Sequence, residues 1–118
     1  MTDIVAFLRA RLDEDQAVAQ SATPGPWVRD ALDVVPEGEH SGHTVAEECH
    51  GDADADHISR HDPAHVLADI ASKRLIIDVV PPPPGAEVPD TGSAWDYILR
   101  LLTLPYATHP DYREEWRP

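Results

Sequence analysis

The chain has 118 residues, with 22 acidic and 9 basic side chains, and its formal net charge is −13 at pH 7 with neutral histidines. A surface of this sign repels nucleic-acid phosphates and anionic lipid headgroups, so direct binding to DNA or RNA is disfavoured. No apolar run approaches the roughly 20 residues that a membrane helix needs. Charged residues also interrupt the N-terminal apolar stretch, which predicts that it is not a signal peptide.

The chain has a single cysteine, Cys49, so it cannot form an intramolecular disulfide. The cysteine pattern of a small secreted domain is therefore missing, which fits a reducing compartment. We expect a cytoplasmic protein, without a membrane partner. The length predicts one small acidic domain covering residues 1–118.

Residues 3–21 carry apolar side chains at helical spacing, and Thr2 or Asp3 can cap the first turn. The residues expected to form the apolar face are Ile4, Val5, Leu8, Leu12 and Val18. We expect this helix to end before the segment 23–26, Thr-Pro-Gly-Pro, because each proline forces the preceding residue out of the helical conformation.

Two short β-prone pieces follow, at residues 27–35 and 43–48. Turn-forming residues at 36–39 and 41–42 separate the two pieces. The pattern predicts either a small β-hairpin or an irregular excursion, with a short helix as a further alternative for the first piece, since the alternation of apolar and polar residues is poor.

Further along the chain, Asp62 followed by Pro63 is typical of a helix start. It predicts a short helix near residues 53–60 and a longer one from 63 to about 79. The apolar residues expected to face the core in the longer helix are Val66, Leu67, Ile70, Leu75 and Ile77.

Residues 81–92 are rich in proline and predict a connector that cannot continue the helix. A third principal helix is expected from Ser93 to Leu104, before Pro105, with its apolar positions at Trp95, Ile98, Leu99, Leu101 and Leu102. The fold class is therefore α+β and mainly α, with three principal helices and the small hairpin or irregular excursion between the first two.

Four segments together carry a family resemblance: VAFLRARLDEDQAVA in the first helix, ATPGPW, DADADHISRHDPAHVLADIASKR, and LRLLTLPYATHPDYREEWRP at the end. The chain resembles an actinobacterial family of small proteins that is catalogued as the domain of unknown function number 6221. The resemblance covers most of the chain. It implies no particular activity.

Acidic residues and histidines concentrate in residues 30–62, which hold ten acids against Arg60 alone and five of the seven histidines. Within this stretch His57 and His61 are four residues apart on an expected helix, where two imidazoles can share a divalent metal such as zinc. His109 could join them through folding, with Cys49 and His50 as weaker candidates. The alternative interpretation is a solvated acidic surface without a metal or any other cofactor, and it is the more common case for such a pattern.

No arrangement of residues typical of catalysis is visible, because the serines lie in no nucleophile elbow and no glycine-rich phosphate loop exists. The residues thus favour a binding protein over an enzyme. Trp27, Tyr112 and Trp116 are candidate partner-binding residues, since aromatic side chains concentrate interface energy. The competing interpretation makes the aromatic tail a clasp over the helical core.

These features predict a non-enzymatic accessory or interaction protein. We expect it to bind a protein partner or a small ligand through the acidic, histidine-rich region and the adjoining aromatic residues. The alternative is a metal-binding protein with a site centred on His57 and His61. The composition does not specify an oligomeric state.

Overall fold

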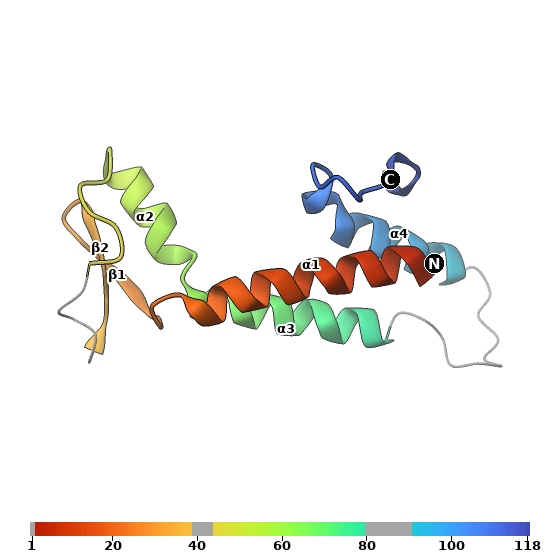
Figure 1. The fold of residues 1–118 in the computed structure, drawn as a ribbon, viewed down its shortest axis with the longest axis horizontal. Coiled ribbons are helices and arrows are strands. Elements are labelled where there is room, and N and C mark those ends of the chain that lie inside the picture. Colours follow the sequence, from red (N-terminus) through yellow and green to blue (C-terminus); the bar gives the residue numbers. More distant parts are fainter. Residues whose placement is uncertain (1, 39–43, 80–90) are drawn as a thin grey trace. The chain divides into compact units, whose positions relative to one another are not determined.

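The computed structural model describes residues 2–38, 44–79 and 91–118 and is mainly helical (Figure 1). The helices and strands in chain order are α1 (Thr2–Ser21), β1 (Trp27–Asp30), β2 (Asp33–Pro36), α2 (Asp52–Arg60), α3 (Pro63–Val79) and α4 (Thr91–Thr103), followed by the 3₁₀ turns η2 (Leu104–Tyr106) and η3 (Glu114–Trp116). This order confirms the predicted fold class, with a small hairpin between the first two principal helices. Most of the proline-rich connector predicted at 81–92 lies outside the described residues.

The chain forms two units, each with its own packing. The first unit comprises Met1–Glu14 and Ala71–Pro118, and the second comprises Asp15–Ile70. Helices α1 and α3 each pass from one unit into the other, so both units contain part of both helices. The expectation of one domain stays a prediction.

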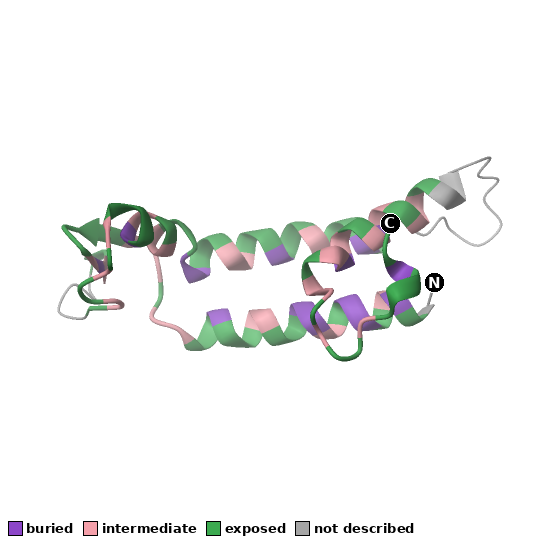
Figure 2. Cartoon of the chain, turned by 90° about the horizontal axis from the view of Figure 1, so that it is seen from above, coloured by how far each residue is buried: buried purple, intermediate pink, exposed green. Residues whose placement is uncertain are grey.

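The core of the first unit gathers apolar residues from α1, α3, α4 and the C-terminal tail (Figure 2). Its buried members are Ile4, Phe7, Leu8, Leu12, Ile77, Leu99 and Trp116. The α1 members occupy positions i, i+3, i+4 and i+8, which places them along one side of the helix. The predicted apolar face of this helix is therefore confirmed over its N-terminal part.

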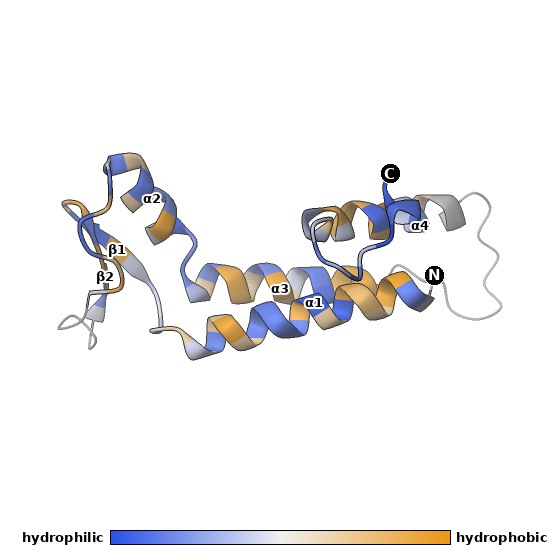
Figure 3. Ribbon diagram, turned by 45° about the horizontal axis from the view of Figure 1, so that its top comes forward, coloured by the Kyte–Doolittle hydropathy of each residue, from blue (hydrophilic) through white to orange (hydrophobic). Residues whose placement is uncertain are grey.

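Three apolar residues expected in the core lie in solvent instead. Val18 is 72% exposed, Leu75 66% and Leu101 44%. Each lies on a helix whose apolar and polar residues alternate along the ribbon (Figure 3). None of the three lies on the side of its helix that carries the buried residues. Leu75, for example, is five residues from buried Ile70 and two from buried Ile77, so it projects from another side of α3.

The hairpin covers the first of the two β-prone pieces and extends one residue beyond it, to Pro36. Strands β1 and β2 are antiparallel, with Asp30 opposite Asp33 and a two-residue turn between them. Ala31 in this turn has φ +55°, a conformation that Asn-Gly or Asp-Gly turns adopt far more readily than Ala-Leu. The turn therefore gives no signal in the sequence. Among the described residues, the expected pairing of residues 27–35 with 43–48 is limited to a bridge between Val34 and Ala46.

Among the described residues, no helix has both the length and the apolar character required to cross a membrane.

Candidate functional site

The second unit is organised around the carboxylate of Asp62, which is only 7% exposed. Its Oδ1 accepts a hydrogen bond of 2.8 Å from the backbone N–H of His65, in the first turn of α3. Its Oδ2 accepts one of 3.0 Å from the backbone N–H of Trp27. The predicted helix start at Asp62 and Pro63 is thereby confirmed, and the same carboxylate also anchors the start of β1.

Gly25 allows the loop before β1 to approach this carboxylate closely. A Cβ atom at position 25 would lie 2.8 Å from Asp62 Oδ2 and 3.0 Å from its Cγ, which is closer than real Cβ contacts allow. Two residues further on, the indole Nε1 of Trp27 donates a hydrogen bond of 2.9 Å to the carbonyl of Thr23. The loop and the carboxylate together fix both the backbone and the ring of Trp27.

The oriented indole lines a groove of about 390 Å³ in the second unit. Its walls are mostly apolar and come from the end of α1, from Trp27 and from the start of α3. The lining residues are Asp15, Val18, Ala19, Ala22, Trp27, His61, Pro63 and Val66. We call this feature the Trp27 groove. Its volume and its apolar walls with few polar groups are typical of ligand sites.

His61, which lines the groove, has one ring nitrogen fixed by a hydrogen bond. Its Nδ1 lies 2.7 Å from the backbone carbonyl of His57. Because a carbonyl can only accept, this contact assigns the imidazole proton to Nδ1 and leaves the lone pair on Nε2 in the neutral ring. A ligand with an N–H donor, or a metal ion, is the complement of that lone pair.

A second cavity, of about 370 Å³, shares His61 with the groove. It is lined by Ala53, Asp56, His57, Arg60 and His61. The rings of His57 and His61 lie here with centroids 4.3 Å apart and planes tilted by 33°, and the ring of His65 lies 5.7 Å from that of His61. All three histidines are exposed, so the predicted pair on α2 is brought together at the surface.

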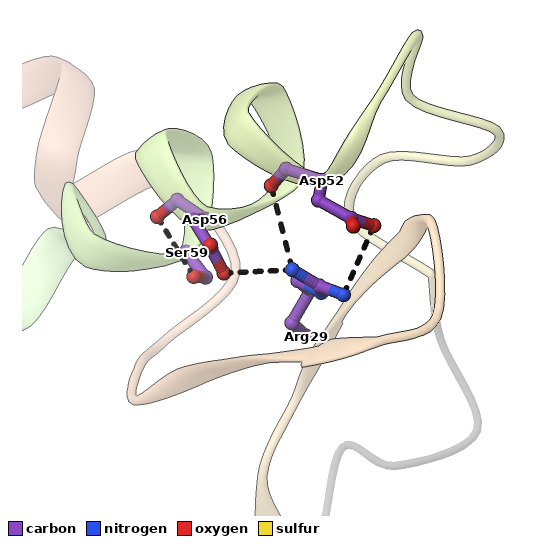
Figure 4. Close-up of polar contacts among 4 residues, drawn as sticks. All are labelled: Arg29, Asp52, Asp56 and Ser59. Atoms are coloured by element: carbon purple, nitrogen blue, oxygen red, sulfur yellow. Dashed lines mark hydrogen bonds and ion pairs between the residues drawn. The ribbon is translucent and has the colours of Figure 1, made fainter.

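Arg29 ties the hairpin to α2 (Figure 4). Its guanidinium is 3.1 Å from Asp52 Oδ1 through Nη2 and 3.1 Å from Asp56 Oδ1 through Nη1. Ser59 Oγ donates to the backbone carbonyl of Asp56 at 3.0 Å.

The second unit is strongly acidic. Residues 15–70 contain twelve acids and two basic residues, Arg29 and Arg60, so the unit has a formal charge of −10. The Trp27 groove therefore belongs to a unit with a large negative formal charge.

The aromatic tail of the first unit packs back onto α1. Trp116 is 8% exposed, and its ring centroid lies 5.1 Å from that of Phe7. The ring of Tyr112 contacts both, at 6.1 Å from Phe7 and 5.7 Å from Trp116. This packing matches the clasp interpretation of the tail, while a partner-binding role for Tyr112 and Trp116 stays a prediction.

His109 belongs to the same clasp. Its ring nitrogens lie 2.9 and 2.6 Å from Nη1 of Arg11, a buried residue, and its ring meets Phe7 edge-on at 5.5 Å between centroids. Arg11 also pairs with Glu14 at 2.8 Å. These contacts hold the imidazole of His109 in the clasp of the first unit, and its metal-binding role stays a prediction.

Near the C-terminus, η3 carries one shifted pair of ionisable groups. Arg117 Nε and Nη2 donate to the two carboxylate oxygens of Glu114 at 2.9 and 3.1 Å. This hydrogen-bonded pair, reinforced by the positive charge of Arg117, lowers the pKa of Glu114 below its ordinary value and raises the pKa of Arg117. Both side chains are exposed, so the pair is a local clamp on the turn.

The remaining predicted metal ligands are Cys49 and His50. Cys49 is half-buried and donates its backbone N–H to the carbonyl of Leu32 at 2.8 Å, and His50 is exposed. Within residues 2–38, 44–79 and 91–118, no group of three or more histidine, cysteine or acidic side chains is arranged to hold a metal ion. Among the predicted ligands, the rings of His57 and His61 are in contact.

The whole chain matches one family model, over residues 1–118. It belongs to the family of unknown function DUF6221. No curated protein and no solved structure matches it. The family resemblance predicted from the segments of the sequence is thereby confirmed.

The sequence predicts Trp27 and His61 as binding residues, and both line the groove of this DUF6221 member, whereas the α1 residues that also line it were not predicted as binding residues. Asp15 lies three residues before Val18 and four before Ala19, so these residues share one side of α1, and Ala22 follows directly after the helix. Val18 was the residue that could have indicated the groove in the sequence. It is apolar, but it does not lie on the side of α1 that carries the buried residues Leu8 and Leu12. It was instead assigned to the core.

Proposed function

We propose that this protein is a non-enzymatic binding protein, and that its Trp27 groove takes a basic, partly apolar segment of a partner protein. The observation that supports the proposal is an apolar groove lined also by Asp15 and His61, in a unit whose formal charge is −10. An anionic ligand would meet repulsion at every approach to this unit.

The chemistry of the walls suits such a segment. An apolar side chain can cover Val18, which is 72% exposed in the groove. A lysine or arginine can lie over the indole face of Trp27, since cations are attracted to aromatic faces. The carboxylate of Asp15 and the Nε2 lone pair of His61 can accept its N–H donors.

An extended partner also uses charge beyond the groove. Asp52 and Asp54 are exposed on α2, in the same unit. A peptide with several basic residues can contact these carboxylates while one apolar side chain is held in the groove. A small cation would reach only one of the two features, so the observations favour a peptide segment.

The test is titration of tag-free protein with a labelled basic amphipathic peptide of about 15 residues, followed by fluorescence anisotropy at low salt. Its acidic counterpart serves as the control ligand. We expect the basic peptide to bind saturably and the acidic one not to bind.

Two matched variants locate the binding surface. Val18 and Val79 are both 72% exposed helical valines, in the second and first unit respectively. Val18→Lys should weaken binding strongly, because it fills the groove and adds a like charge, whereas Val79→Lys should weaken it much less. Equal losses for the two variants, or no binding of the basic peptide at all, would refute the proposal.

A further inference from the structure

We infer that His57 and His61 form a binding site for a divalent transition-metal ion, and that a metal ion there closes the Trp27 groove to its ligand. The first part stands on the histidine geometry alone. The second part rests on the proposed function, because it concerns competition for the same His61 nitrogen.

The two imidazoles are placed by the backbone of α2 and its C-terminal cap. Residues four apart on a helix project from the same side, and the ring centroids of His57 and His61 are 4.3 Å apart. Both side chains are exposed, so water can complete the coordination of a bound ion. Two protein ligands plus water make an open site.

The hydrogen bond from His61 Nδ1 to the carbonyl of His57 has a direct consequence for metal binding. Metal-binding histidines commonly donate their second ring nitrogen to a carbonyl or carboxylate, which orients the ring and fixes its tautomer. His61 already has this arrangement at 2.7 Å. Its Nε2 is consequently the nitrogen that a metal would meet.

His57 is free to adapt to an ion bound at His61. Within the described part of the chain its ring contacts His61 and has no hydrogen bond. The planes of the two rings are tilted by 33° with their centroids 4.3 Å apart, and His57 must turn its ring to bring a nitrogen towards the ion. An exposed ring makes this turn at little cost.

The donor set selects the kind of metal. Imidazole nitrogens suit nickel, copper and zinc, whereas calcium and magnesium require oxygen ligands. Asp56 and Arg60 line the same cavity with opposite charges. The formal charge of −10 over residues 15–70 raises the local concentration of any cation.

The coupling to the groove follows from the position of His61, which lines both cavities. A neutral imidazole with its proton on Nδ1 has one lone pair in the ring plane. That lone pair can bind a metal ion or accept an N–H donor from a groove ligand, but it cannot do both. By thermodynamic linkage, each ligand must weaken the binding of the other by the same factor.

The metal site is tested by isothermal titration of tag-free protein with nickel chloride. We expect one ion per chain. His57→Gln and His61→Gln should each weaken nickel binding by more than about tenfold, since even second-shell changes cost about 10- to 100-fold. His50→Gln, at an exposed histidine of the same unit, is the matched control and should leave binding unchanged. Failure of the wild type to bind one ion, or an equal loss in the His50 variant, would overturn the metal site.

The coupling is tested by repeating the peptide titration with nickel present. Nickel should weaken peptide binding in the wild type but not in His57→Gln, a variant that leaves the groove lining intact. Equal peptide affinity with and without bound nickel would overturn the coupling.

The two titrations also distinguish failure of the proposed function from failure of the metal site. If nickel binds and the peptide never does, the proposed function and the coupling fail while the metal site stands. If the peptide binds and nickel does not, the metal inference alone fails.

Discussion

The backbone N–H of Trp27 donates a 3.0 Å hydrogen bond to the carboxylate of Asp62, a residue 35 positions later in the chain. The other carboxylate oxygen caps α3 through the N–H of His65. One side chain therefore caps the start of α3 and anchors the backbone of Trp27, whose indole lines the Trp27 groove.

Replacing Asp62 should destabilise the second unit and alter the groove together. Asp62→Ala removes a helix cap, which costs about 1 kcal/mol, and leaves the N–H of Trp27 without its acceptor, at a further cost of about 1–3 kcal/mol. The summed loss of about 2–4 kcal/mol is measurable by urea unfolding. Asp30→Ala, at an exposed aspartate of β1, is the control and should change stability by less than about 0.5 kcal/mol.

Gly25→Ala should be destabilising because the new methyl group would lie 2.8 Å from Asp62 Oδ2. We expect a loss of about 1–3 kcal/mol from this crowding. Gly51→Ala, where nothing lies within 4 Å of an added Cβ, should be neutral. In an Asp62→Ala background the crowding atoms are gone, so Gly25→Ala should cost much less there. Additive effects in this double-mutant cycle would contradict the contact.

The ion pairs of Arg29 should make a small, salt-sensitive contribution to stability. Its side chain is 31% exposed and those of its partners Asp52 and Asp56 are 76% and 49% exposed, so solvent screens both pairs. Arg29→Gln should lower the free energy of unfolding by less than about 1 kcal/mol. The difference from wild type should shrink at about 1 M salt, where the Debye length is about 3 Å. A loss that salt does not reduce would show that Arg29 acts through packing instead.

Glu114 should titrate at a lower pH than an ordinary glutamate, because the hydrogen bond and the charge of Arg117 favour the ionised form. A lowered pKa in the folded state means that the pair stabilises η3 above the ordinary glutamate pKa, and that this contribution is lost as the pH falls through the lowered value. Carbon-13 NMR of the side-chain carboxyls can follow this titration. Arg117→Gln should move the midpoint of Glu114 upward, while Arg9→Gln, at an arginine that pairs with Asp78, should not. An unchanged midpoint in the Arg117 variant would rule out the clamp.

Local signals made the helices predictable. The proline segment at 23–26 ends α1 within two residues of its observed boundary, and Asp62 with Pro63 marks the break between α2 and α3. Both signals act through the backbone of their own neighbours, so no distant contact is needed to interpret them. The family membership followed from the same segments.

The Trp27 groove could not be predicted from the sequence, because it depends on contacts between distant segments that no local pattern encodes. Asp62 was recognisable as a cap, but its second hydrogen bond to Trp27 joins segments that only folding brings together. Val18 was assigned to the core because apolar residues at helical spacing usually lie there, and its exposure places it in the groove wall instead. The turn at Ala31 has a positive φ that alanine rarely adopts, which concealed the hairpin within the first β-prone piece.

The distribution of charge between the two units has a kinetic consequence. Residues 15–70 have a formal charge of −10 and the rest of the chain −3. The field of the molecule therefore draws an approaching cation towards the unit that contains the groove, before any apolar contact forms. Added salt should then slow the encounter of a basic ligand, while the residence time of the bound ligand depends on the apolar walls.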